Sequence, residues 1–214
     1  MKRIQDDVWE TTVEKPFPGL TTHAYLLIRD GGNVLFYNTS HRDDIDIFAA
    51  LGGVAFQLLS HRDELGDSIA VIRQRYGARL AGHIREQDEF SRIQPPDILF
   101  DKREVILGNI EVIPSPGHSP GSTCFLASPA NGKRYLFTGD TIYRGEDGSW
   151  QAGFIPGYSK AEDRETLADS LRLLQTLQPH LVFSSAFGGS EGFQEMFPAD
   201  WRGHVERALE GLLG

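Results

Sequence analysis

The sequence has a single cysteine, only two methionines and no long apolar run among its 214 residues. Cys124 alone can form neither an intrachain disulfide nor an all-cysteine zinc site, which fits a reducing compartment. No window approaches the roughly 20 apolar residues that cross a bilayer. The first residues, MKRIQDDVWETT, are acidic where a signal peptide would be apolar. We therefore expect a soluble, cytoplasmic protein without a membrane partner.

Positive charge is also scarce, with 21 Lys and Arg against 30 Asp and Glu and a formal net charge of −9. Such a surface repels a phosphate backbone, so nucleic acid is a poor candidate partner and a small-molecule substrate is favoured. The 40% of hydrophobic residues is enough for a sizeable core. The simplest organisation is one domain over residues 1–214.

Alternating apolar runs and turn signals indicate a mixed α/β chain. The Asp-Gly-Gly stretch at 30–32 lies between two β-rich runs and favours a tight hairpin turn. The apolar run GVAFQLL at 53–59 predicts a buried strand between two helices. One helix is expected at about 42–51, and the other carries apolar residues at helical spacing before ending at Gly77.

The middle of the chain favours strands and its last third favours helices. Four short β-favouring runs lie at 103–108, 110–115, 122–128 and 134–139. Ser159 and Glu162 form a capping-box pattern before a helix whose leucines, between 167 and 177, share one face. Pro198 is well placed to open a last amphipathic helix, whose apolar face leaves room for a homodimer. This order of elements suggests two packed sheets with helices outside.

Three segments place a potential metal ligand at the turn that follows a strand. LLSHRDELGD contains His61 and Asp63, PSPGHSPGS contains His118, and LFTGDTIY contains Asp140. Rigid strand ends can hold imidazole and carboxylate groups while the loops leave a coordination position open for water. The sequence therefore predicts that these four residues are metal ligands.

These segments resemble the metallo-β-lactamase-fold superfamily of metal-dependent hydrolases. The resemblance extends from the hairpin THAYLLIRDGGNVLFYN to the long helix before the final strand, and SPGHSPGS and FTGDTIYR are its most specific parts. In that family the Pro-Gly-His turn supplies one ligand and the aspartate after Thr-Gly bridges two metals, roles that match His118 and Asp140. The implied fold is α/β, a four-layer αββα sandwich of two mixed β-sheets with the metal site at one edge.

The first motif departs from the H-x-H-x-D-H pattern of the family. His61 matches the first histidine, and Asp63 stands where the second would be. Leu65 and Gly66 occupy the Asp-His positions, and neither side chain can bind a metal. The Gly-His-Gly that follows the final strand in the family is replaced here by SSAFGGS, with Ser-Ala-Phe at 185–187.

The number of remaining ligands predicts one divalent ion at most. The first metal position keeps His61, His118 and Asp140, with Asp63 as a further ligand, which suffices for a tetrahedral or more open site. The second keeps only Asp140 and, after a two-residue shift, Asp67. Carboxylate in place of imidazole at Asp63 moves the preference toward iron, manganese or magnesium, while the resemblance favours zinc. A chain that binds no metal stays open as an alternative.

Each singled-out residue also has a structural interpretation. His61 could cap a strand end or lie in the core, and Glu64 is best interpreted as a solvated turn residue. Asp67 precedes a helix, where aspartate is a favoured N-cap. Asp140 could accept hydrogen bonds from backbone amides of its own turn. Cys124 lies in a β-run and is expected to be a core residue rather than a nucleophile.

Two classes of function follow from these residues. The first is a metal-dependent hydrolase of a small ester, thioester, lactone or amide, in which metal-activated water attacks and Asp67 or Asp63 orients it or accepts its proton. The alternative is a non-catalytic relative that acts as a small-molecule-binding or regulatory module. Leu65 and Gly66, at positions where ligands are expected, motivate this second hypothesis.

The segment YRGEDGSWQAGFIPGYSK at 143–160 is the candidate substrate-facing loop because it is rich in glycine and aromatic residues. Its aromatic residues are Tyr143, Trp150, Phe154 and Tyr158. The alternative is a surface crossover that the same aromatic side chains hold against the protein.

Overall fold

The computed structural model describes residues 1–16, 18–157, 159–197 and 199–214. Tyr158 and Pro198, two residues singled out from the sequence, lie outside the described residues. Backbone contacts divide the chain into two compact units, Met1–Asp101 and Lys102–Gly214. The single domain expected from composition stays a prediction.

The first unit is built on a mixed sheet. In spatial order its strands are β1 (Lys2–Arg3), β2 (Val8–Glu10), β4 (Tyr25–Leu27), β5 (Val34–Phe36), β6 (Phe56–Leu58), β7 (Arg79–His83) and β8 (Ile98–Phe100). Pairs from β1 to β5 are antiparallel, and those from β5 to β8 are parallel. The predicted hairpin is confirmed: β4 and β5 are joined by a turn in which Gly31 and Gly32 have φ of 83° and 106°.

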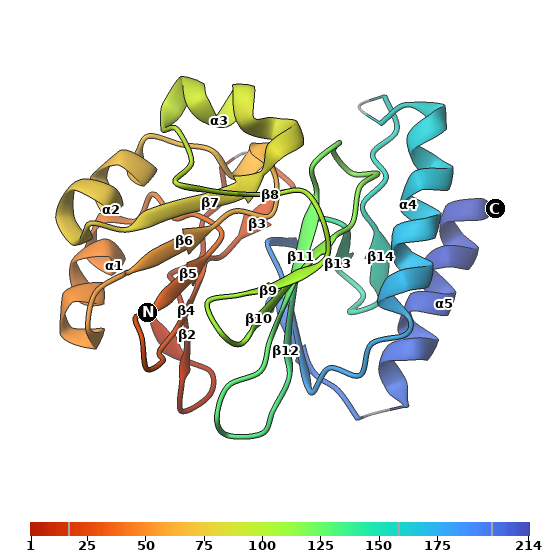
Figure 1. Cartoon of the computed structure of the whole chain (residues 1–214). Coiled ribbons are helices and arrows are strands. Elements are labelled where there is room, and N and C mark those ends of the chain that lie inside the picture. Colours follow the sequence, from red (N-terminus) through yellow and green to blue (C-terminus); the bar gives the residue numbers. More distant parts are fainter. Residues whose placement is uncertain (17, 158, 198) are drawn as a thin grey trace. The chain divides into compact units, whose positions relative to one another are not determined.

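Both helices predicted in the first unit are present, one as α1 (Arg42–Ile47) with η1 (Phe48–Leu51) and the other as α2 (Ser68–Tyr76). The structure adds η2 (Arg62–Glu64), η3 (Ile84–Glu86) and α3 (Gln87–Ile93), which the sequence analysis did not predict, and β3 (Thr21–Thr22) is a short strand. In Figure 1, α1 and α2 lie along the same side of the sheet. Helix α2 ends at Gly77, which has the left-handed φ of 70° expected of a helix-terminating glycine. The predicted strand between these two helices is β6, which is parallel to both of its neighbours.

The second unit also contains a mixed sheet. Its strands are, in order, β17 (Phe193–Glu195), β15 (Leu181–Ser184), β12 (Tyr135–Gly139), β11 (Thr123–Ala127), β10 (Ile110–Pro114) and β9 (Glu104–Ile106). Only the β12–β15 pair is parallel. Nearby, β13 (Ile142–Arg144) pairs with β14 (Trp150–Ala152) and β16 (Ala186–Phe187). All four β-favouring runs predicted in the middle of the chain contain a strand.

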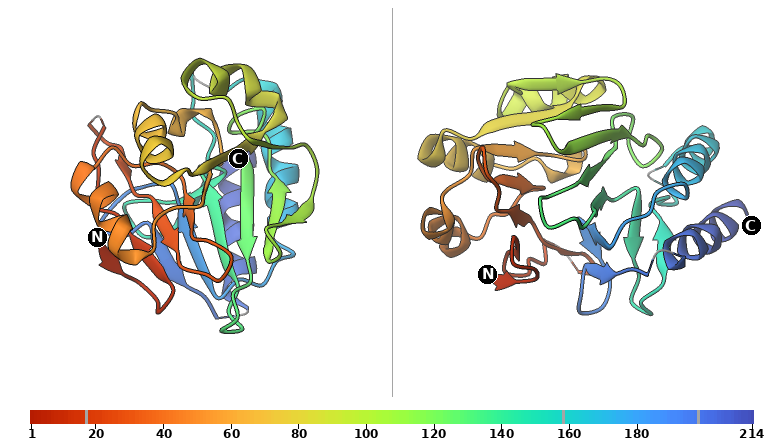
Figure 2. Two further views of the ribbon diagram at one scale, coloured as in Figure 1. Left: turned by 60° about the vertical axis from the view of Figure 1, so that its left-hand side comes forward. Right: turned by 60° about the horizontal axis from the view of Figure 1, so that its bottom comes forward.

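Helices α4 (Ala161–Leu174) and α5 (Asp200–Leu213) pack side by side in the second unit (Figure 2). Their buried apolar residues include Leu167, Leu171, Leu174, Trp201, Val205 and Leu212. The predicted capping box at Ser159 and Glu162 is wrong by one residue, because the Lys160 backbone N–H donates to Asp163 Oδ2 at 2.8 Å. Ser159 Oγ instead accepts the backbone N–H of Ile155.

The predicted α/β class with mixed sheets is confirmed. Each unit combines antiparallel and parallel strand pairs with helices that carry buried apolar side chains. Among the described residues, no helix has the length and apolar character needed to cross a bilayer.

Candidate metal centre

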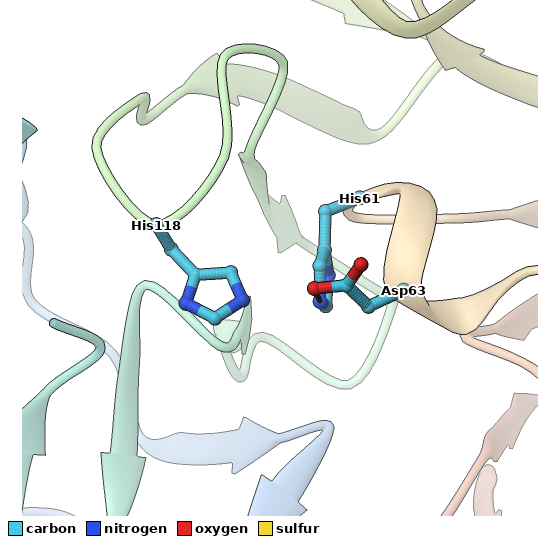
Figure 3. A group of neighbouring side chains, drawn as sticks. All are labelled: His61, Asp63 and His118. Atoms are coloured by element: carbon cyan, nitrogen blue, oxygen red, sulfur yellow. Dashed lines mark ion pairs between the residues drawn. The ribbon is translucent and has the colours of Figure 1, made fainter. Parts of the chain in front are cut away.

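The first ligand turn follows strand β6. His61 has an extended backbone and precedes η2, and its side chain is 2% exposed. The Asp63 carboxylate lies beside the His61 ring, with 3.8 Å between His61 Nε2 and Asp63 Oδ2 (Figure 3). Asp63 is 45% exposed, so it can face a ligand or solvent. We call His61 and Asp63 the first half-site.

Glu64 is buried beneath this turn, with 4% of its side chain exposed. One carboxylate oxygen accepts the Ser60 backbone N–H at 2.8 Å, and the other accepts the Ser60 hydroxyl. His61 Nδ1 lies 2.9 Å from Ser60 Oγ and 3.3 Å from Glu64 Oε1. The prediction that Glu64 is a solvated turn residue was wrong, because η2 folds this side chain back onto the end of the strand. The spacing of Ser60 and Glu64, four residues apart on either side of His61, was the signal in the sequence that could have revealed this contact.

The second ligand turn lies between β10 and β11. His118 projects from this loop (Figure 3), and its side chain is 2% exposed. His118 Nδ1 is 2.8 Å from the carbonyl oxygen of Gly153. A carbonyl only accepts hydrogen bonds, so Nδ1 carries a hydrogen, and in the neutral ring Nε2 then has the lone pair. Nε2 lies 3.9 Å from Asp140 Oδ2. We call His118 and Asp140 the second half-site.

Asp140 is oriented by a distant backbone group. Its Oδ1 accepts the N–H of Ala186 at 3.0 Å, and its side chain is 18% exposed. One alternative from the sequence was that Asp140 is bound by the amides of its own turn, whereas this donor comes from strand β16, 46 residues away. Ala186 and Phe187 are apolar and buried, so the window in which the family has its last histidine supplies no imidazole.

Within each half-site, the spacing of the donor atoms fits a divalent metal ion. A tetrahedral ion with bonds of about 2.1 Å separates its ligand atoms by about 3.4 Å. The nitrogen-to-oxygen separations of 3.8 Å and 3.9 Å exceed this by little. A side-chain shift of about half an ångström would let either pair chelate an ion.

Two further positions of the first motif, Leu65 and Gly66, offer no metal ligand. Leu65 packs against a buried cluster of Leu59, Ile69, Leu80 and Phe90, and Gly66 has no side chain. Asp67 occupies the N-cap position of α2, as predicted, but its exposed side chain makes no capping hydrogen bond. Its catalytic role stays a prediction.

Three aromatic residues of the candidate substrate loop line one cavity of about 490 Å³ in the second unit, namely Tyr143, Trp150 and Phe154. Burial and the charge of Asp140 raise the pKa of Tyr143. Trp150 is buried and donates its Nε1–H to Gln194, while the Phe154 ring lies 4.6 Å from the Arg164 guanidinium carbon. Their contact with substrate stays a prediction, and Tyr158 lies outside the described residues.

Cys124 is fully buried in β11, as predicted for a core residue. Burial raises the pKa of its thiol to about 11. We expect the Cys124 thiol of the native protein to react slowly with an aromatic disulfide reagent, because the reacting species is an exposed thiolate. The unfolded protein should react at once with one equivalent of the reagent. Absorbance of the released thiol measures both rates. Rapid stoichiometric reaction of the native protein would contradict this burial.

The fold is shared with solved metallo-β-lactamase structures. A metallo-beta-lactamase from Pontibacter korlensis is 18% identical, with a TM-score of 0.72, 98% of this chain covered and 97% of that one. A Cronobacter sakazakii enzyme described by its HARLDQ motif is 16% identical, with a TM-score of 0.68 and coverage of 95% and 96%. A metallo-beta-lactamase superfamily protein from Sulfolobus tokodaii is 16% identical, with a TM-score of 0.68 and coverage of 97% and 86%. At such identities these likenesses show the fold alone.

A sequence model described as the metallo-beta-lactamase superfamily matches residues 49–186, more than half of the chain. The chain therefore belongs to the metallo-beta-lactamase superfamily. No curated protein matches it. The matched range includes both half-sites.

Proposed function

We propose that this protein is a metal-dependent hydrolase of a small ester, thioester, lactone or amide, with one divalent ion bound by His61, Asp63, His118 and Asp140. The observation that carries the proposal is the placement of both Nδ1 atoms. His61 Nδ1 lies 2.9 Å from a hydroxyl and His118 Nδ1 lies 2.8 Å from a carbonyl. With the hydrogen on Nδ1, each Nε2 carries the lone pair that a metal ligand needs, as in many histidine ligands whose other nitrogen is hydrogen-bonded.

Ring nitrogens and carboxylate oxygens of this kind suit zinc, iron or manganese. A bound ion would lower the pKa of water from about 16 to about 7 and polarise a substrate carbonyl. The Asp63 side chain is 45% exposed, against 2% for each histidine and 18% for Asp140. We therefore assign the Asp63 oxygen that does not bind the ion to orient the water and accept its proton. Asp67 is the second candidate for that role. Asp140 is fixed by the Ala186 amide and contributes charge rather than movement.

We propose one ion rather than two because residues that cannot bind a metal stand at most ligand positions of the second metal. Leu65 is packed on the core, Gly66 lacks a side chain, and Ala186 and Phe187 are apolar. Two carboxylates without an imidazole bind a transition metal weakly. The expectations of a cytoplasmic location, a small-molecule substrate and no nucleic-acid or membrane partner rest on composition and remain proposals. The homodimer, which rests on the apolar face of the last helix, is also a proposal.

Metal analysis tests the proposal directly. Protein purified without chelator and then incubated separately with zinc, manganese and anaerobic iron should retain about one equivalent of at least one metal. Chromogenic esters, thioesters, lactones and amides should be hydrolysed, and chelation followed by metal addition should remove and restore the activity. Retention of none of the metals would reject the hydrolase. Two tightly held equivalents would reject the single-ion site.

The packing of Leu65 also favours a second candidate, a non-catalytic binding or regulatory module. A former ligand position that now contributes to the core has acquired a structural role. This candidate predicts that a small ligand binds without turnover in every metal-loaded form. Metal-dependent hydrolysis of any of the test substrates would count against it.

A further inference from the structure

We infer that Glu64, acting through Ser60, holds His61 in the tautomer that presents Nε2 to the metal. Glu64 is then a positioning residue, and the inference rests on the proposed function for its purpose. Its geometry lies entirely within the first unit and involves three consecutive contacts among Ser60, His61 and Glu64.

A count of donors and acceptors determines the direction of these hydrogen bonds. The two Glu64 carboxylate oxygens accept the Ser60 backbone N–H and the Ser60 hydroxyl proton. Ser60 Oγ has one proton, which is already donated, so toward His61 it can only accept. His61 Nδ1, at 2.9 Å from Ser60 Oγ, must therefore carry the hydrogen. Nε2 is left with the lone pair that a metal needs.

Burial of the three residues strengthens the preference for the tautomer with the hydrogen on Nδ1. Ser60 and His61 are each 2% exposed, and the Glu64 side chain is 4% exposed. Water therefore cannot readily exchange for these partners, and a mismatch of two donors or two acceptors would be costly. The three residues favour one tautomer before any metal binds.

The same count predicts the effect of exchanging one oxygen for an amide. In Glu64→Gln the side-chain oxygen must face the backbone N–H of Ser60, because that donor cannot rotate. The amide NH₂ then faces Ser60 Oγ and donates to it, so the hydroxyl proton turns toward His61 Nδ1. We therefore expect Glu64→Gln to invert the tautomer and place the hydrogen on Nε2.

Ser60→Ala provides a contrasting variant. It removes the hydroxyl but leaves Glu64 Oε1 at 3.3 Å from His61 Nδ1, close enough to accept the hydrogen directly. The Nδ1–H tautomer should persist in this variant. Glu89→Gln is the matched control, since Glu89 is a neighbouring carboxylate that pairs with Arg62 at 3.5 Å.

The test is nitrogen NMR of the full-length, metal-free chain labelled on histidine, at a pH where the imidazole is neutral. A His61→Gln variant assigns the His61 resonances. We expect Nδ1–H in the wild type, Ser60→Ala and Glu89→Gln, and Nε2–H in Glu64→Gln. Nε2–H in the wild type, or an unchanged tautomer in Glu64→Gln, would overturn the inference; the wild-type spectrum decides even if a variant fails to fold.

Metal affinity supplies an independent readout. Competition with a chromophoric chelator should show zinc bound about 10- to 100-fold more weakly by Glu64→Gln, the usual loss when a partner of a ligand histidine is removed. Glu89→Gln should bind as the wild type does. If the wild type binds no metal while Glu64→Gln still inverts the tautomer, the proposed function fails and the positioning of His61 stands.

Discussion

Replacing His118 with alanine is expected to abolish metal binding and hydrolysis. His118 is buried, its Nδ1 donates to Gly153, and its Nε2 is the imidazole nitrogen of the second half-site that faces Asp140. Without it, three ligand candidates remain, and only one of them is an imidazole. One imidazole with two carboxylates holds a transition metal more weakly than a site with two imidazoles does. We expect retained metal to fall below about a tenth of an equivalent and activity to fall to background.

Elemental analysis of the purified variant measures the metal, and the substrate panel measures the activity. His204→Ala is the matched control, because His204 lies partly exposed on α5 of the same unit and interacts with Arg207 rather than with a ligand candidate. The control should keep both properties. A full metal equivalent in His118→Ala would remove His118 from the ligand set, and loss of metal in His204→Ala would point to unfolding instead.

Gly117→Ala is expected to destabilise the second unit strongly, through two separate physical effects. Gly117 precedes His118 and has a φ of 128°, a region that costs other residues about 1–2 kcal/mol. A Cβ there would also lie 2.5 Å from the backbone N and Cα of Leu167 in α4. Overpacking of this kind costs about a further 1–3 kcal/mol. The sum is a large part of a typical stability of about 5–15 kcal/mol.

Gly108→Ala separates the two contributions to this loss. Gly108 has a similarly left-handed φ of 84°, but no atom lies within 4 Å of its added Cβ. It should lose only the conformational part, about 1–2 kcal/mol. Urea unfolding monitored by circular dichroism compares the variants. Equal losses would show that the approach of Leu167 to the turn does not matter, and only the Gly117 variant should also lose metal.

The sequence predicted those features whose structure depends on a few consecutive residues, namely turns, helix ends and short motifs. The hairpin at Gly31 and Gly32 and the end of α2 at Gly77 were readable because positive φ favours glycine wherever it occurs. The superfamily was readable because its ligand turns are short and contiguous, and residues 49–186 match it. The predicted capping box was wrong by one residue because Glu162 and Asp163 are adjacent acidic residues that both suit the third position of the helix, and Asp163 makes the contact.

The roles of several site residues were decided by tertiary structure. Glu64 looks like a solvated turn residue in the sequence, yet η2 buries it against Ser60 and His61. Leu65 looks like a lost ligand, yet it packs on the core beside α2. The burial of Glu64 does not follow from its residue type, because it depends on what the rest of the unit places over the turn.

The sequence by itself therefore determined the superfamily, the mixed α/β class and the identities of His61, His118 and Asp140 as ligand candidates. Only the tertiary structure decided how those side chains are held. His118 is oriented by a carbonyl 35 residues away, and Asp140 by an amide 46 residues away. The physical reason is that turn and strand preferences act over a few residues, whereas a buried imidazole or carboxylate takes its hydrogen-bond partner from whichever backbone the fold brings to it.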